Sequence, residues 1–341
     1  MVTRTTLESI LSTLPRLTIG LVGDLFLDRY LELEPGVQEL SIETDLEAYQ
    51  IARVRNSAGA LGTVLNNLAA LGVGMLVPAT VIGDDGHGYD LLREVRALPV
   101  DPTHILCLRE RLTPTYTKPM RQDAAGVWRE LNRLDFRTRG PLSEAASGEL
   151  CNRVRQVFHS SDGLIVLDQI NEANWGVVDE RMRILLAELQ REDPKKLLYI
   201  DSRRHLSEFS FGTLKGNRRE LLGAAGESGS DEAALARAAN KLCTTTRQSV
   251  FCTLGEQGIL VARPGEKLAV APAVPVAGPI DIVGAGDAAT SGIVAALLAG
   301  TSAIEAAAVG NLVASITVQQ LGTTGTASPQ QLRERWQRLQ N

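Results

Sequence analysis

Short apolar runs alternate with amphipathic segments through most of the chain. The apolar runs predict buried strands at residues 17–22, 76–82, 163–167, 197–200, 250–254 and 259–262, the last two as a pair. Apolar residues at helical spacing predict helices at residues 61–68, 90–98, 178–189 and 230–239, with mainly helical structure after residue 284. Strands that alternate with helices in this way predict a mostly parallel sheet covered by helices on both faces.

Two segments, residues 30–56 and 113–136, interrupt this order. They carry period-two or mixed strand patterns without intervening helices, so we expect a small β-layer that stands off the main sheet as a lid. The predicted fold class is therefore α/β, a three-layer α/β/α sandwich with a mostly parallel central sheet plus a small β-layer lid. We expect residues 1–341 to form one domain, with the lid segments inserted within it.

Composition and charge narrow the function classes. The chain has 341 residues, of which 44% are hydrophobic and 22% charged, a balance typical of globular proteins. Its net charge of −5 disfavours non-specific binding to nucleic acid. No apolar run approaches the ~20 residues that cross a bilayer, and residues 1–15 lack the pattern of a secretory signal. We expect a cytoplasmic enzyme that binds neither nucleic acid nor a membrane.

The strongest chemical signal lies at residues 281–287. Gly284, Ala285 and Gly286 allow close approach of a ligand, and the helix that follows supplies free N–H groups for phosphate oxygens. Asp287 would repel a bound phosphate unless it accepts a proton from an attacking hydroxyl. Two alternatives stay open: Asp287 is an ordinary first-turn acid, or the turn belongs to a dinucleotide site, although no strand follows to complete a βαβ unit.

Two further pairs have spacings that could serve a site. If residues 24–28 are extended, Asp24 and Asp28 share one face and could hold sugar hydroxyls. Asn217 and Glu220, three residues apart, lie on one side of a first helical turn. Solvated acids at a strand end are the alternative for the first pair, and a capping box is the alternative for the second.

The motifs together, in this order, resemble the ribokinase-like (pfkB) carbohydrate kinases over nearly the whole chain. The resemblance implies that Gly284, Ala285, Gly286 and Asp287 form the catalytic turn and that Asn217 and Glu220 organise Mg²⁺ and nucleotide phosphates, with Glu220 acting indirectly. It also implies a set of nucleotide-binding residues: Thr253, Gly255, Gly258 and Asn311. The sugar-binding residues it implies are Asp24, Asp28, Gly59 and Asn67.

Residues 115–121, 131–136 and 322–329 resemble the heptose 7-phosphate kinase branch of that family. Lys118, Arg121 and Arg133 would then suit a substrate that already bears a phosphate, with ordinary lid-surface charge as the alternative. The chain departs from the family pattern at the sugar end and near the catalytic turn, at Ala60, Thr63, Ile282 and residues 168–172. We therefore expect the phosphoryl-transfer end to match the family better than the sugar end.

The function predicted is an ATP-dependent phosphotransferase that acts on a hydroxyl of a sugar or sugar phosphate, with Asp287 as the base. The resemblance implies ATP and Mg²⁺, a monovalent cation such as K⁺ at Asp281 and residues 322–328, and a homodimer formed through the lid. One alternative is a non-catalytic sugar or nucleotide sensor on the same scaffold. Another is a kinase that works beside a nucleotidyltransferase on a separate chain.

Overall fold

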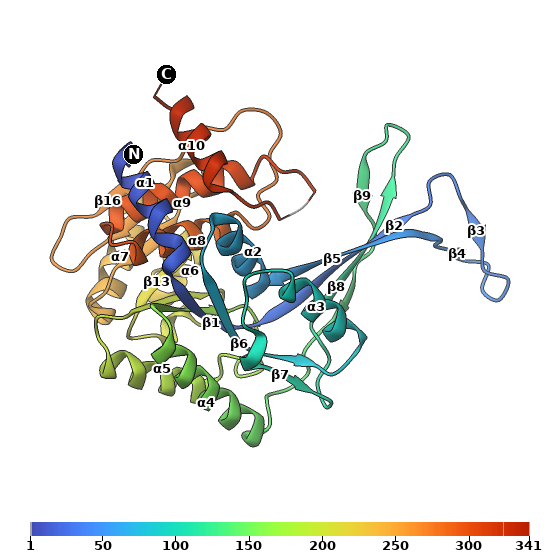
Figure 1. Cartoon of the computed structure of the whole chain (residues 1–341), viewed down its shortest axis with the longest axis horizontal. Helices are drawn as coiled ribbons and strands as arrows, with labels where there is room; N and C mark the ends of the chain where they lie inside the picture. Colours follow the sequence, from blue (N-terminus) through green and yellow to red (C-terminus); the bar gives the residue numbers. More distant parts are fainter. Residues whose placement is uncertain (1, 323, 341) are drawn as a thin grey trace.

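A nine-stranded sheet forms the centre of the computed structural model, which describes residues 2–322 and 324–340 (Figure 1). The strand order is β16-β15-β14-β13-β12-β11-β1-β6-β7; the strands from β14 to β7 run parallel, while β15 and β16 are antiparallel. The strands are β1 (Thr18–Gly23), β6 (Met75–Gly83), β7 (Ile105–Leu108), β11 (Gly163–Asp168), β12 (Leu197–Ser202), β13 (Thr213–Asn217), β14 (Val250–Thr253), β15 (Ile259–Ala262) and β16 (Ala269–Ala271).

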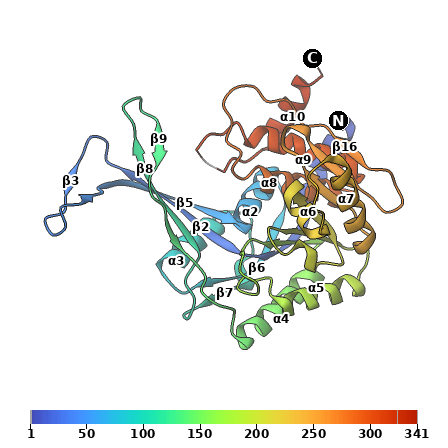
Figure 2. The same cartoon turned by 180° about the vertical axis from the view of Figure 1, so that it is seen from behind.

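Successive side chains of the central strands enter two separate cores. In β11, Leu164 and Val166 join one apolar cluster, while Ile165 and Leu167 join the other. The helices on the first cluster's face are α4 (Glu144–Ser160), α5 (Glu180–Glu192), α6 (Arg218–Ala225) and α7 (Glu232–Thr246). The opposite cluster involves α1 (Arg4–Thr13), α2 (Leu61–Leu71), α3 (Gly86–Arg96), α8 (Ala285–Leu298), α9 (Ala303–Thr317) and α10 (Pro329–Arg338). The predicted three-layer sandwich is therefore confirmed (Figure 2).

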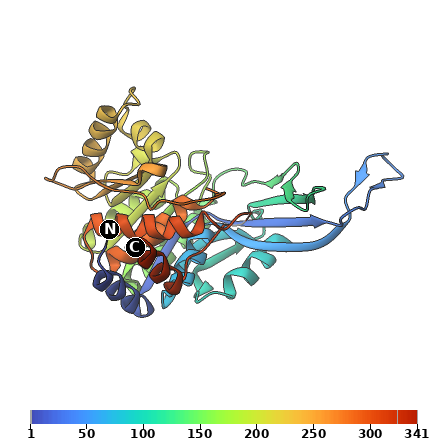
Figure 3. The ribbon, with the colours of Figure 1, turned by 90° about the horizontal axis from the view of Figure 1, so that it is seen from above.

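A second sheet begins where the chain leaves the carboxyl end of β1. Its order is β10-β8-β2-β5, and β9 pairs with β8, while β3 and β4 form a separate hairpin at the tip. Figure 3 shows this layer projecting away from the helices as a long arm. Its strands are β2 (Leu25–Leu33), β3 (Glu39–Leu40), β4 (Glu47–Ala48), β5 (Ile51–Ala60), β8 (Thr115–Gln122), β9 (Trp128–Glu130) and β10 (Leu134–Phe136).

Two predicted boundaries were wrong. Helix α3 begins at Gly86 rather than near residue 90, because Asp85 caps it by accepting the Gly88 N–H at 2.7 Å. The first lid segment begins at Leu25 and ends at Ala60, beyond residues 30–56, because β2 follows β1 after one residue and β5 leads directly into α2. Within the described ranges, no helix combines the length and apolar character needed to span a membrane.

Candidate active site

Helix α8 begins at a turn of small residues. Gly284 caps the helix with φ of 79°, a conformation that glycine adopts without steric cost. A Cβ on Gly284 would contact the side chains of Thr324 and Thr63. Within the described part of the chain, no acceptor engages the N–H of Gly286 or Asp287. The turn therefore presents free donors and the positive end of a helix dipole, which suits an anion.

The Asp287 carboxyl belongs to the first turn of this helix. Burial raises the pKa of Asp287 to about 7; Lys215 and Arg203 act to lower that pKa, while Asp201 and Asp28 act to raise it further. Charged residues of β12, β13 and the second sheet therefore all influence this carboxyl. A carboxyl that titrates near neutrality is suited to take up a proton at physiological pH.

A buried ion pair lies beneath the turn. Lys215 Nζ is 2.7 Å from Asp201 Oδ2, and the same oxygen accepts the Thr290 hydroxyl of α8 at 3.2 Å. A Cβ on Gly286 would lie 3.3 Å from Lys215 Nζ. The pair thus ties β12 and β13 to the start of α8. Sequence analysis missed Lys215, although a lysine within a strand that leads directly to Asn217 was a usable signal.

Three neighbouring cavities run from the second sheet along the carboxyl ends of the central strands. A small cavity of about 50 Å³ between the two sheets shares Asn171 and Arg203 with a cavity of about 560 Å³. That cavity shares Asn217 with a third, of about 610 Å³, which reaches Thr253 and Leu254. We call this row of three adjoining cavities the groove. It lies at the edge of the sheet where open α/β folds bind their ligands.

The turn at residues 253–258 closes one end of the groove. Thr253 ends β14, and Gly255 and Gly258 have φ of 59° and 100°. A Cβ on Gly258 would clash with the backbone of residues 271–273. Asn311 donates to the carbonyl oxygens at positions 271 and 272 at 2.9 and 3.1 Å. Asn311 therefore positions the segment that packs on this turn, and its expected place near adenine stays a prediction.

Asn217 and Glu220 form the capping box of α6. The Asn217 side chain accepts the Glu220 N–H at 3.0 Å, and Glu220 Oε2 accepts the Asn217 N–H at 2.7 Å. Burial raises the pKa of Glu220. Both residues line the groove, so the cap and a ligand site are compatible.

Their carboxylate and amide oxygens are of the type that Mg²⁺ prefers, and Mg²⁺ commonly binds through one or two carboxylates plus substrate phosphates. No three His, Cys, Asp or Glu side chains gather as a metal cage in residues 2–322 and 324–340. The donor set at Asn217 and Glu220 fits a magnesium ion shared with a nucleotide.

At the other end, the structure brings Asp28, Gly59 and Lys118 together. Asp28 Oδ1 lies 2.8 Å from Lys118 Nζ, which also donates to the Tyr30 hydroxyl at 3.3 Å. A Cβ at position 59 would overlap Asp28 Oδ2. Glycine at this position of β5 therefore leaves the space that the Asp28 carboxylate occupies. Lys118 pairs with Asp28, and its expected contact with a substrate phosphate stays a prediction.

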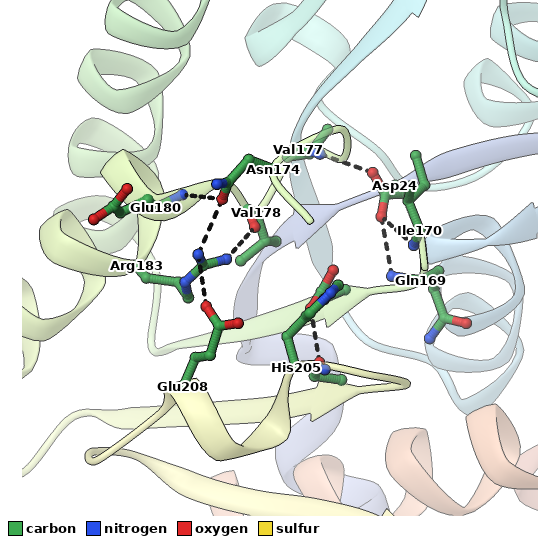
Figure 4. A network of polar contacts seen from close by, with 12 residues as sticks. Asp24, Gln169, Ile170, Asn174, Val177, Val178, Glu180, Arg183, His205 and Glu208 are labelled. Carbon is green, nitrogen blue, oxygen red and sulfur yellow. Dashed lines mark hydrogen bonds and ion pairs between the residues drawn. The ribbon is translucent and has the colours of Figure 1, made fainter. Parts of the chain in front are cut away.

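Asp24 has a different environment from the one expected. It lies between β1 and β2, not on the strand face of Asp28, and it is 3% exposed. Its carboxylate accepts the N–H groups of Gln169, Ile170 and Val177 at 3.0, 3.2 and 2.8 Å (Figure 4). Burial raises the pKa of Asp24 to about 6, although these N–H groups act to lower it. Asp24 therefore holds the loop at residues 169–177, and this differs from direct sugar binding.

The same loop has a second anchor on α5. Arg183 donates to Val178 O and Asn174 Oδ1, each at 3.0 Å, and pairs with Glu208 at 2.7 Å (Figure 4). These bonds hold the far side of the loop, while Asp24 holds the near side. The two anchors together place Asn171 in the wall of the groove.

The remaining lid cations also have acidic partners. Arg121 pairs with Glu47, and Arg133 pairs with Asp135 through bonds of 2.6 and 2.8 Å. Arg133 lies over the Tyr116 ring at 4.2 Å. Each arginine thus has an acidic partner within the lid, and its expected contact with a substrate phosphate stays a prediction.

Asn67 is buried inside α2. It is 1% exposed, and its Nδ2 donates to Thr63 O at 2.9 Å. No partner for its Oδ1 occurs among the residues described. The structure thus gives Asn67 an intrahelical role, and its expected contact with sugar stays a prediction.

Asp281 links the start of the catalytic turn to the chain after α9. Its Oδ1 accepts the Val283 N–H at 3.0 Å, and its Oδ2 accepts the Gly322 N–H at 3.2 Å. This contact joins Asp281 to the loop expected to share a monovalent cation with it. Thr323, within that loop, lies outside the described residues.

The architecture is that of the ribokinases. The ribokinase of Arabidopsis thaliana, solved with ribose and ATP, matches with a TM-score of 0.68 and 17% identity over 94% of this chain and 98% of its own. Phosphofructokinase-2 of Escherichia coli, solved with potassium, matches with a TM-score of 0.69 and 17% identity over 95% of this chain and 100% of its own. These likenesses confirm the ribokinase-like fold.

Sequence comparison finds similar proteins as well. Residues 191–331 match the pfkB family carbohydrate kinases, and this segment contains Asp201, Lys215 and Asp287. The bifunctional protein HldE of Desulfatibacillum aliphaticivorans is 29% identical over 89% of this chain and 60% of its own length. The HldE of Trichlorobacter lovleyi is 28% identical over 96% of this chain and 65% of its own. The chain is thus similar to pfkB family carbohydrate kinases over residues 191–331, and it spans less than two thirds of the length of these two relatives.

Proposed function

We propose that the protein transfers the γ-phosphoryl group of ATP to a hydroxyl of a sugar or sugar phosphate. The observation that carries this proposal is the placement of Asp287. Its carboxyl, with a pKa raised to about 7 by burial, lies in the first turn of α8 beside free N–H groups and interacts with charges of both sheets. A non-catalytic sensor would have no use for a carboxyl in an anion site.

In the reaction, Asp287 accepts the proton of the attacking hydroxyl. The sugar oxygen forms a bond to the γ-phosphorus, the bridging P–O bond breaks, and its electron pair stays on the ADP product. The N–H groups of Gly286 and Asp287 stabilise charge on the transferred group, a contribution worth on the order of 3 kcal/mol for a well-placed donor. The second sheet covers the acceptor and limits water as a competing acceptor.

The nucleotide would lie along the cavities of about 560 and 610 Å³, with its base toward the turn at residues 253–258. Asn217 and Glu220 would hold Mg²⁺, which neutralises phosphate charge when bound. Asp281 would support a monovalent cation such as K⁺ close to the turn. ATP as co-substrate is the reason that we place the enzyme in the cytoplasm.

The acceptor would lie against Asp28 and the small cavity between the two sheets. Phe26, Tyr116 and Phe136 supply apolar and aromatic surface to that cavity, and Asn171 and Glu172 supply polar groups. This mixture suits the faces and hydroxyls of a sugar. The resemblance of the lid segments to heptose 7-phosphate kinases supports a sugar phosphate as one member of the class.

Exposed apolar side chains at the tip of the lid are evidence in favour of a homodimer. Leu40, Ile42 and Leu46 are 62%, 100% and 70% exposed on the arm that projects from the molecule. Apolar side chains in such a group are typical of an interaction surface. Ile42→Asp is expected to shift the mass measured by light scattering from dimer to monomer.

The direct test is to supply MgATP with a panel of sugars and sugar phosphates and to measure ADP release. At least one acceptor should give turnover, and Asp287→Asn should lower kcat by about 10²–10⁴-fold while ATP affinity is retained. If no acceptor is phosphorylated but sugars bind, the protein is a sensor and the proposal fails.

A further inference from the structure

Arg203 lies in the wall that two cavities of the groove share. It follows β12, and its backbone N–H donates to Asp168 O at 3.0 Å, which fixes it at the carboxyl ends of β11 and β12. Arg203 and Asn171 are the residues that the small cavity under the lid shares with the cavity of about 560 Å³. In the proposed function, the acceptor lies at the first cavity and the nucleotide along the second, so Arg203 lies between them.

Among the described residues, Arg203 forms no ion pair. In the lid, Arg133 pairs with Asp135, and Arg137, also in the wall of the small cavity, pairs with Glu172 at 2.9 Å. By contrast, the Arg203 side chain makes no hydrogen bond or ion pair with any residue that the structure describes. A guanidinium is always charged, and its fork of donors matches phosphate oxygens. Arg203 thus has its full donor set available for a ligand.

The charge of Arg203 affects the pKa of two groups in the proposed reaction. Arg203 acts to lower the pKa of Asp287 and that of Glu220, against the burial that raises both. Arg203 also lines the same cavity as Glu220. Its neighbour Arg204 lines the cavity of about 560 Å³ but not the small cavity under the lid.

We propose that Arg203 is a catalytic residue that contacts the phosphoryl group while it is transferred. The inference rests on the proposed function. As the bond to the sugar oxygen forms and the bond to ADP breaks, negative charge spreads over the three non-bridging oxygens of the phosphoryl group. The N–H groups of α8 would stabilise this charge from one side. The Arg203 guanidinium would stabilise it from the wall of the groove.

Arg203→Gln is the test variant, and Arg16→Gln, at an exposed arginine before β1, is its matched control. With MgATP and an acceptor found in the panel, we expect Arg203→Gln to lose about 10²-fold in kcat and to change KM for ATP by less than about threefold. Arg16→Gln should keep kcat within about threefold. Arg203→Lys should recover part of the loss, because it restores the charge but not the fork. Circular dichroism and thermal melting check that each variant folds.

A binding measurement separates transition-state contact from a structural effect. With ADP, Mg²⁺, aluminium fluoride and the acceptor, Arg203→Gln should bind the complex at least about tenfold more weakly, with ADP affinity unchanged. If the wild type turns over but Arg203→Gln equals Arg16→Gln, or raises only KM for the acceptor, the inference is overturned and the proposed function stands. If the wild type phosphorylates no acceptor, the proposed function fails and this inference fails with it.

Discussion

The Lys215 ammonium lies 2.7 Å from the Asp201 carboxylate, and this buried pair lies under the turn that carries Asp287. Its effect on Asp287 is twofold. Lys215 acts to lower the pKa of Asp287, whereas Asp201 acts to raise it. The pair also fixes the start of α8 through the bond from Thr290 to Asp201. One buried network therefore both positions the base and limits how far burial raises its pKa.

The pH dependence of the reaction follows from Asp287. Below its pKa of about 7 the carboxyl is protonated and cannot accept a proton, and above that pH it is the competent base. We expect kcat/KM to rise with pH through about 7 and then reach a plateau. Steady-state rates between pH 5 and pH 9 measure this. A profile that is flat across neutrality would show that another group accepts the proton.

Replacement of Asp287 should also stabilise the fold at high pH. Burial raises the pKa of Asp287 from 3.8 to about 7, so the folded state carries an unfavourable carboxylate above pH 7, and this penalty is lost as the pH falls through that value. Asp287→Asn removes the penalty. Its Tm at pH 8 should exceed that of the wild type by at least ~2 °C, and the gap should narrow at pH 5. A lower Tm at pH 8 would contradict this account of the carboxyl.

Asp24→Asn tests the loop-holding role. An amide has one acceptor oxygen instead of two, so at least one of the N–H groups of Gln169, Ile170 and Val177 loses its partner. We expect a loss of about 1–3 kcal/mol in the free energy of unfolding and a larger rise in KM for the acceptor than for ATP. Denaturant titration and steady-state kinetics measure the two effects.

The matched control is Asp231→Asn, at the N-cap of α7, where asparagine caps as well as aspartate. This control should leave both quantities near the wild-type values. Equal rises in both KM values for Asp24→Asn would argue against a selective effect on the acceptor end.

Gly59→Ala tests the space that Asp28 needs. A Cβ at position 59 would overlap Asp28 Oδ2, so the carboxylate must move away from Lys118 or the strands must shift. We expect KM for the acceptor to rise at least about tenfold, with KM for ATP little changed. Gly86→Ala is the control, because a Cβ there meets no atom within 4 Å and its φ is not left-handed. An unchanged acceptor KM would remove Asp28 from the proposed acceptor site.

Much of the fold was predictable because its signals are local. Apolar runs marked β1, β6, β11, β12 and β14, and the helices between them required a parallel sheet with two covered faces. Asp287 was also predictable, because an acid after Gly284 and Gly286 is unusual chemistry for an anion site. These features depend on neighbours in the chain.

The roles that sequence analysis missed depend on distant partners. Asp24 binds N–H groups that follow it by 145 to 153 positions, which no spacing rule reveals. Lys118 looked like a free cation because its partner Asp28 comes from another strand of the lid. Sequence analysis did not identify Arg203, because its proposed role depends on an unpaired side chain at the place where two cavities adjoin.

The central claim is that Asp287 takes the proton of the acceptor hydroxyl beside the γ-phosphate. The most direct measurement is a crystal structure with a non-hydrolysable ATP analogue, Mg²⁺ and the acceptor. The account predicts an Asp287 oxygen at about 2.6–3.2 Å from the acceptor hydroxyl, and the γ-phosphate at the first turn of α8. A triphosphate bound away from α8, or an acceptor hydroxyl beyond the reach of Asp287, would contradict it.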